Sequence, residues 1–248
     1  MSDLDWLTAR PIAHRGLHDA RAGIIEGTAS AIAAAIEGHY GIEVDLQITS
    51  DGEAMVHHDE RLGRLTEGQE RLAAMTAADL QKVRFKATSD RMMTLGELCD
   101  LVRGRATMLL ELKSGFDGDR RVALRTVDVL KGYRGAVAVM SFDPDLVGAL
   151  KDVAPGLARG ITAMGHYNDP EWATLSAWQK MTFPYLAQSA ITRPHFVAYA
   201  LNDLPAAAPW LARQVLGLPL LVWVARGADD SVRARRMADQ MIFEDFRP

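Results

Sequence analysis

Two carboxylates stand two residues apart in the strongly alternating segment 41–49. Successive side chains of a β-strand point to opposite faces, so Glu43 and Asp45 share one face while the apolar residues between them share the other. Two like charges side by side repel each other, and burying both without a partner would cost several kcal/mol. A hard divalent cation with oxygen ligands would neutralise them. The pattern therefore predicts a metal site, and its plainer alternative is an edge strand with a solvated acidic face.

A second pair with the same spacing follows in the predicted strand 107–113, where Glu111 and Lys113 also share one face. Two adjacent histidines, His57 and His58, lie in a short extended segment after the first acidic strand. Strand parity sends these two side chains to opposite faces, so at most one of them faces the site. Histidine exchanges protons near neutral pH, and it is therefore suited to acid–base catalysis beside a metal.

The charges of the candidate residues suit a phosphodiester. Glu43, Asp45 and Glu111 together carry −3. A divalent cation with Arg15 and Lys113 carries +4, so one phosphodiester, at −1, makes the whole set neutral. The arginine and the metal can share the non-bridging oxygens, while the lysine neutralises charge that develops on phosphorus. Without the cation the carboxylates repel one another, so we expect Asp45→Asn to leave the metal-free protein as stable as before or slightly more so.

Eight predicted strands alternate with helices along the chain, an order typical of a parallel sheet closed into a (β/α)8 TIM barrel. An open doubly wound sheet is the alternative, but it would normally carry a glycine-rich phosphate loop after an early strand, and the sequence has none. In a TIM barrel the catalytic residues gather at the carboxyl ends of the strands, where the polar residues above are expected. The strands are predicted at residues 11–16, 41–49, 107–113, 136–142, 158–163, 196–201, 220–225 and 240–244, and the main helices at 29–37, 95–102, 120–133, 144–153, 204–216 and 230–238.

Two long connections interrupt this alternation. Residues 60–92, after the second strand, are polar and weakly periodic, and they are predicted to form a short inserted segment with one helix near 77–83. The second connection, 164–195, has helical character around 171–180. No repeat, low-complexity tract or linker divides the chain, so residues 1–248 are expected to form a single domain.

The composition is that of an ordinary soluble protein, with 48% hydrophobic and 24% charged residues. A formal net charge of −4 gives no electrostatic reason to expect nucleic acid or an anionic membrane as a partner. The only cysteine, Cys99, excludes an intrachain disulfide and points to a reducing compartment. The first residues lack the positively charged segment and apolar run of a signal peptide, so we expect none, and no apolar run reaches transmembrane length. We expect a cytoplasmic protein without stable membrane insertion, and the sequence leaves its oligomeric state open.

A series of motifs runs along the chain in a fixed order. It consists of Ala13-His14-Arg15-Gly16, Glu26-Gly27-Thr28, Ile42-Glu43-Val44-Asp45, Thr49, Asp51-Gly52, His58-Asp59, Glu111-Leu112-Lys113, Ser141-Phe142-Asp143-Pro144, Leu221-Val222-Trp223-Val224 and Phe243-Glu244. In these residues the chain resembles the glycerophosphodiester phosphodiesterases. The resemblance spans nearly the whole chain, and it implies a (β/α)8 barrel with a short insertion after the second strand. The implied activity is the divalent-metal-dependent hydrolysis of glycerophosphodiesters, which are small molecules, to glycerol phosphate and an alcohol.

The resemblance also implies the metal ligands and the proton-transfer groups. Glu43, Asp45 and Glu111 match the metal ligands by position, with Mg²⁺ as the first choice of cation and Ca²⁺ as the alternative. His14 and His58 match the acid–base pair. Which histidine is the acid and which the base stays open, as does the alcohol of the substrate.

The remaining positions concern the substrate. Arg15 and Lys113 match phosphate contacts. Trp223 matches an aromatic wall near the glycerol, although its apolar strand equally suits a core tryptophan. The family usually has asparagine where this chain has Gly27, which leaves the shape of that loop open. Glu26 beside it is therefore expected either to touch the metal or to brace neighbouring side chains.

Two alternatives to a glycerophosphodiesterase remain. One is a phospholipase D-like barrel that acts on lysophospholipids or sphingolipids, although such a protein is expected to be secreted and to carry disulfides. The other is a non-catalytic barrel that binds a phosphate ester without cleaving it. Retention of both His14 and His58 favours catalysis, because a pure binder needs no pair of proton-transfer groups.

Overall fold

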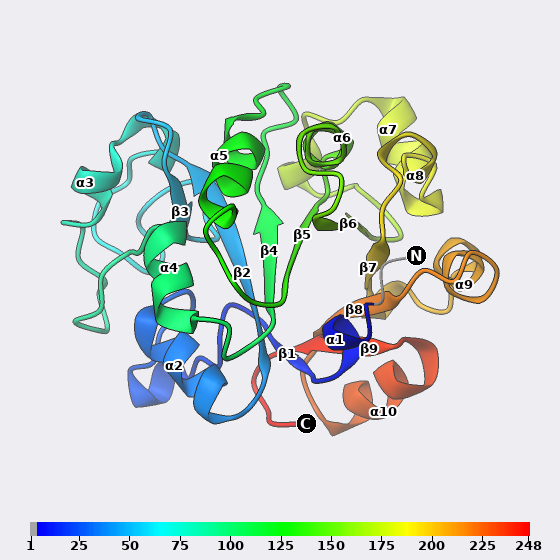
Figure 1. Cartoon of the computed structure of the whole chain (residues 1–248), viewed down its shortest axis with the longest axis horizontal. Coiled ribbons are helices and arrows are strands. Elements are labelled where there is room, and N and C mark those ends of the chain that lie inside the picture. The colour runs from blue at the N-terminus through cyan, green and yellow to red at the C-terminus, as the bar shows by residue number, and fades with distance from the viewer. Residues whose placement is uncertain (1–3) are drawn as a thin grey trace.

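Eight parallel strands close into a barrel in the computed structural model, which describes residues 4–248. The barrel closes because β1 (Ile12–Ala13) pairs with β2 (Gly41–Ile48) on one side and with β9 (Gln240–Phe243) on the other (Figure 1). Among the described residues one further strand, β3 (Ala54–Val56), runs antiparallel to the end of β2. The predicted (β/α)8 barrel is thereby confirmed. The parallel strands are β1 (Ile12–Ala13), β2 (Gly41–Ile48), β4 (Met108–Leu112), β5 (Val137–Ser141), β6 (Ala158–Ala163), β7 (Phe196–Ala200), β8 (Leu220–Ala225) and β9 (Gln240–Phe243).

Helices occupy the connections between these strands, and local sequence explains where several of them begin. Thr94 and Glu97 form a capping box at the start of α4 (Leu95–Val102). The Asp143 side chain caps α6, and Pro144 fits the first turn of that helix because it lacks an N–H to satisfy. The longer helices are α2 (Ala29–Glu37), α4 (Leu95–Val102), α5 (Arg121–Leu130), α6 (Pro144–Val153), α9 (Ala207–Gln214) and α10 (Ala228–Met237); the short elements are α1 (Asp5–Thr8), η1 (Ala20–Ala22), η2 (Leu72–Ala74), α3 (Ala77–Leu80), η3 (Pro170–Trp172), α7 (Ala177–Thr182), η4 (Phe183–Tyr185), α8 (Ser189–Thr192) and η5 (Leu201–Asp203).

Side-chain alternation along the strands separates two apolar layers. Val44 and Leu110 pack in the large layer that also contains residues of the surrounding helices. Leu109 packs in a second cluster with Ile12 and other strand residues that face the barrel interior. Because Glu111 follows Leu109 by two residues, it shares that inward face one step closer to the carboxyl end of β4. The apolar interior thus lies directly beneath the candidate site.

The segment after β3 is held together by its own small core. Residues 57–94 contain only η2, α3, loops and isolated bridges before α4 begins. This arrangement agrees with the inserted segment predicted at 60–92. Its buried apolar side chains Leu62, Leu72, Leu80, Phe85 and Met92 pack in one cluster with Ile25 and Met55, which lie outside the segment.

The connection between β6 and β7 has helical character around 171–180, as predicted, but it is divided among several short elements. The chain forms η3, α7, η4 and α8 in succession. Pro170 and Pro184 each stand at the start of a 3-10 helix, and Ser176 forms a capping box that starts α7 only at Ala177. Asp169 and Ser176, the residues before η3 and α7, both have an extended backbone, so these two helical segments are separate. Within residues 4–248, the helices are too short or too polar to cross a bilayer.

Candidate active site

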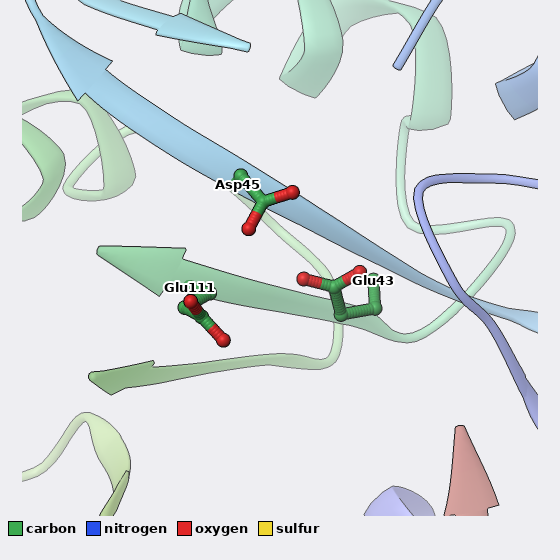
Figure 2. Close-up of side chains that lie close together, drawn as sticks. All are labelled: Glu43, Asp45 and Glu111. Carbon is green, nitrogen blue, oxygen red and sulfur yellow. The ribbon is translucent and has the colours of Figure 1, made fainter. Parts of the chain in front are cut away.

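Three buried carboxylates converge at the carboxyl end of the barrel. Glu43, Asp45 and Glu111 each offer one oxygen atom, and these atoms all lie within 4.8 Å of one another. The first two project from β2 and the third from the neighbouring β4, where Asp45 and Glu111 stand opposite each other in the strand register (Figure 2). Their exposed fractions are 1%, 3% and 7%. Alternation along β2 thus produces the shared acidic face that the sequence predicts.

Two cationic side chains contact this acidic cluster unequally. Lys113 Nζ lies 2.8 Å from Asp45 Oδ1 and 2.5 Å from Glu111 Oε1. Arg15 Nε lies 3.4 Å from Asp45 Oδ2, and the backbone N–H of Arg15 donates to Glu43 Oε2 at 3.0 Å. Glu43 therefore accepts a hydrogen bond from a backbone N–H, but it forms no ion pair with the side chain of Lys113 or Arg15. Asp45 is held between two cations.

This asymmetry sets the protonation of the cluster. Burial raises the pKa of Glu43 well above its usual range, and the negative charges of Asp45 and Glu111 raise it further. Burial also raises the pKa of Asp45, but Lys113 and other nearby positive charges outweigh it and hold that pKa below its usual range. The three residues fit a hard cation, because their donors are all carboxylate oxygens and the buried Asp45 Oδ2 has no hydrogen-bond partner.

His14 lies at the end of β1, beside the acidic cluster. Its Nδ1 is 2.5 Å from Glu244 Oε2, and its Nε2 is 3.9 Å from Glu43 Oε2. Burial lowers the pKa of His14, although the hydrogen bond with Glu244 opposes this effect. Glu244 belongs to the last sequence motif, but the sequence predicts no role for it. Its place at the end of the final predicted strand was the signal, since strand ends build the sites of such barrels.

The adjacent histidines separate as strand parity predicts. His58 is partly exposed and lines the main cleft, and its Nδ1 lies 2.8 Å from Asp59 Oδ1. His57 is buried and meets Phe85 of the inserted segment edge-on, with ring centroids 6.5 Å apart. Burial lowers the pKa of His57. Of the two, His58 is the one that lines the main cleft.

Glu26 braces neighbouring arginines and lies outside the acidic cluster. Its Oε1 accepts from Arg15 Nη1 and from Arg64 Nη2, both at 2.7 Å. Burial raises the pKa of Glu26, but the two arginines outweigh it and lower that pKa to about 2. Gly27 adopts φ +69°, a left-handed conformation that glycine and asparagine adopt more readily than other residues. The departure from the family's asparagine is thus compatible with the same loop shape.

A cleft of about 1080 Å³ opens above the carboxylates. His14, His58, Arg15 and Lys113 line one part of it. Aromatic side chains line another part, among them Phe116, Phe142, Trp172 and Trp223. The Trp223 and Phe142 rings meet edge-on with centroids 5.5 Å apart, and the buried Trp223 Nε1 has no hydrogen-bond partner. The structure therefore brings all the sequence-predicted site residues except Glu26 to the wall of one cleft.

Known proteins resemble this chain in sequence. A sequence model of the glycerophosphoryl diester phosphodiesterase family matches residues 14–247. A glycerophosphodiester phosphodiesterase of Caldanaerobacter subterraneus is 31% identical over 160 residues, which cover 60% of this chain and 65% of that protein. Glycerophosphodiester phosphodiesterase 1 of Mus musculus is 28% identical over 192 residues, which cover 71% of this chain and 56% of the mouse protein. The chain thus spans less than two thirds of the length of these relatives.

Solved structures share the fold. A phosphodiesterase of Oleispira antarctica, in complex with the product sn-glycerol-3-phosphate, has a TM-score of 0.76 at 19% identity and covers 96% of this chain and 94% of its own. A glycerophosphodiester phosphodiesterase of Thermotoga maritima has a TM-score of 0.70 at 23% identity, with coverages of 94% and 92%. The family match extends over nearly all of a barrel whose strand ends carry the predicted motifs. This chain therefore belongs to the glycerophosphoryl diester phosphodiesterase family.

Proposed function

We propose that this protein hydrolyses glycerophosphodiesters to glycerol phosphate and an alcohol, with a divalent cation bound by Glu43, Asp45 and Glu111. The observation that carries the proposal is the convergence of these buried carboxylates in the same cleft as His14 and His58. Family membership supports the same reaction class. Mg²⁺ is the first choice and Ca²⁺ the alternative, since both prefer oxygen ligands.

The cationic side chains would bind the phosphate. When bound, the divalent cation would polarise the phosphoryl oxygens as a Lewis acid. Arg15 lies beside Asp45 and Glu26, and its guanidinium is suited to donate to a non-bridging oxygen. Lys113 keeps its proton, since Asp45 and Glu111 raise its pKa despite the opposing effect of burial. It therefore supplies a fixed positive charge that stabilises negative charge developing on phosphorus.

The two histidines would divide the proton transfers. Cleavage expels an alkoxide, which is a poor leaving group unless it gains a proton as the P–O bond breaks. The attacking oxygen, from water or from the substrate's glycerol hydroxyl, must lose a proton. One of His14 and His58 would serve as the base and the other as the acid, each contributing roughly 10²–10⁴-fold to the rate.

Turnover of a panel of esters tests the reaction and the cation together. Glycerophosphocholine, glycerophosphoethanolamine, a lysophospholipid and sphingomyelin are each incubated with purified protein, with chelator or with added Mg²⁺ or Ca²⁺. We expect glycerophosphodiester hydrolysis that stops with chelator and returns with one of the ions. Glu111→Gln should lower the rate by roughly 10² or more. The matched control Glu67→Gln, at an exposed carboxylate of the inserted segment, should leave it unchanged.

Three results would contradict the proposal. Full turnover in chelator-treated protein would show that the reaction does not require a divalent cation. Cleavage of the lysophospholipid or sphingomyelin alone would indicate the phospholipase D-like reaction, and binding of every ester without cleavage would indicate a non-catalytic barrel.

A nitrophenyl phosphodiester separates the two histidines, because its leaving group departs without a proton. Replacing the acid with alanine should cripple cleavage of the natural ester and largely spare the nitrophenyl ester, whereas replacing the base should damage both. Equal proportional losses of the two activities in His14→Ala and His58→Ala would show that the histidines do not divide the work.

A further inference from the structure

Glu244 connects the end of the last strand with the end of the first. β1 and β9 pair in parallel with Ala13 opposite Phe243, so the residues that follow each strand emerge side by side. The His14 N–H donates to the Phe243 carbonyl at 2.9 Å, and His14 Nδ1 lies 2.5 Å from Glu244 Oε2. Backbone and side chain together hold His14 against β9.

Arg226 occupies the second oxygen of Glu244. It follows β8, and its Nε and Nη2 each lie 2.6 Å from Glu244 Oε1. A guanidinium group only donates, so it requires an acceptor at this position. Glu244 Oε2 accepts from His14 Nδ1, and Nε2 is then the ring nitrogen that faces Glu43 at 3.9 Å. The nearby His18 Nε2 lies 3.9 Å from the same Glu244 oxygen.

The other candidate catalytic histidine is held in the same way. His58 Nδ1 lies 2.8 Å from Asp59 Oδ1, and Arg64 Nε lies 2.6 Å from Asp59 Oδ2. Two histidines from distant parts of the chain therefore share one arrangement of imidazole, carboxylate and arginine. A contact that merely joined β1 to β9 would not require the same arrangement at His58.

We infer that Glu244 is a positioning residue for His14 and that Arg226 fixes the orientation of Glu244, an inference that rests on the proposed function. The carboxylate selects the tautomer with the proton on Nδ1 and presents Nε2 to the substrate. Glu244 does not line the main cleft, so it would act through His14 and not by touching the substrate. Its loss should therefore lower kcat more than it raises KM, and by no more than the loss of His14 itself.

Glu244→Gln probes this arrangement sharply. Arg226 still requires an acceptor, so the new amide oxygen faces Arg226 and the amide NH₂ faces His14, which forces the proton onto Nε2. We expect kcat to fall roughly 10–100-fold with KM changed by less than about threefold. Adding Arg226→Met frees the introduced side-chain amide to rotate, so that its oxygen can face His14 again. We expect kcat of this double variant to be about fivefold higher than that of Glu244→Gln alone.

Two controls separate positioning from stability. In a His14→Ala background, Glu244→Gln should cause no further loss, because the residue that it positions is gone. Asp239→Asn is the matched variant, since Asp239 immediately precedes the same strand at its opposite end and lies 2.9 Å from Arg213 Nε. It should lower the melting temperature without lowering kcat.

A Glu244→Gln kcat within about twofold of wild type, or a full further loss in the His14→Ala background, would overturn the inference.

Nitrogen-15 NMR of the imidazoles adds a readout that needs no turnover. It should place a proton on His14 Nδ1 in the wild type and on Nε2 in Glu244→Gln, and a wild-type proton on Nε2 alone would also overturn the inference. A wild-type protein that carries the Nδ1 proton yet hydrolyses no ester would contradict only the proposed function.

Discussion

Neutralising Asp45 and neutralising Glu43 should have opposite effects on the metal-free protein. Asp45 lies 2.8 Å from Lys113 Nζ and 3.4 Å from Arg15 Nε, so Asp45→Asn removes the charge that both cations face. Glu43 accepts a backbone N–H from Arg15, and a glutamine at this position accepts the same bond. The sequence-based expectation that Asp45→Asn leaves the metal-free protein no less stable is therefore revised. It applies to Glu43→Gln instead.

The size of each effect follows from these contacts. A hydrogen bond to a charged group contributes about 1.5–3 kcal/mol, and Lys113 keeps Glu111 as its second partner at 2.5 Å. We therefore expect Asp45→Asn to cost about 2 kcal/mol, which corresponds to roughly 4–8 °C in a chain of this size. Glu43→Gln breaks no ion pair with Lys113 or Arg15, and near pH 5 it should change the unfolding free energy by less than about 0.5 kcal/mol.

The stability of Glu43→Gln relative to wild type should grow with pH. The folded-state pKa of Glu43 lies above its ordinary value of 4.5, so above pH 4.5 the Glu43 carboxyl binds more protons in the folded than in the unfolded wild type. The contribution of Glu43 to wild-type stability must then fall as pH rises through this window, by at most about 1.4 kcal/mol per pH unit. Glutamine does not titrate, and the variant escapes this loss.

Thermal and urea unfolding of both variants and the wild type, in chelator from pH 5 to 8, would measure these differences. If Glu43→Gln loses as much melting temperature as Asp45→Asn, or if its advantage over wild type does not grow with pH, the assigned charge pattern is incorrect. Adding Mg²⁺ or Ca²⁺ should reverse the order of wild type and Glu43→Gln, because a ligand that binds only the folded state stabilises it.

Substitutions at Gly27, Gly160 and Glu26 give three further predictions for the stability of the protein. Gly27→Asn should be nearly neutral in thermal unfolding, whereas Gly27→Val should cost about 1–2 kcal/mol, because a β-branched residue resists φ +69°. Gly160→Ala should destabilise by about 1–3 kcal/mol, since its Cβ would lie 2.2 Å from the buried Phe196 ring; an unchanged melting temperature would contradict this packing. The pKa of Glu26 is lowered to about 2, so its ion pairs stabilise the wild type above pH 4.5 and are lost as pH falls toward 2. Glu26→Gln should therefore be less stable at neutral pH, with a shallower acid dependence between these values in pH-dependent urea unfolding.

The strands and their inward carboxylates could be predicted because they depend on local periodicity. Alternation over residues 41–49 places Glu43 and Asp45 on one face wherever the strand lies in the sheet. Glu111 and Lys113 follow the same rule on β4. Once eight strands are arranged as a barrel, their carboxyl ends meet, and the acidic cluster results.

The partners of the histidines could not be predicted, because they depend on contacts between distant segments. Glu244 is separated from His14 by 230 positions, and only the pairing of β9 with β1 brings them together. Arg64 meets Asp59 and Glu26 through the fold of the inserted segment, which has little periodicity. The helical character predicted around 171–180 is present, but its division into η3 and α7 was not predicted, because the capping box at Ser176 starts a separate helix.

The closing contact between β1 and β9 also matters while the chain is being synthesised. Until residues 240–243 have left the ribosome, β1 has no partner on one side and β8 has none on the other. Each then presents an open row of backbone hydrogen-bonding groups, which invites pairing with neighbouring nascent chains. Premature termination before β9 should therefore produce an aggregation-prone product. A chaperone that binds exposed strand edges would find both edges accessible until β9 pairs and the barrel closes.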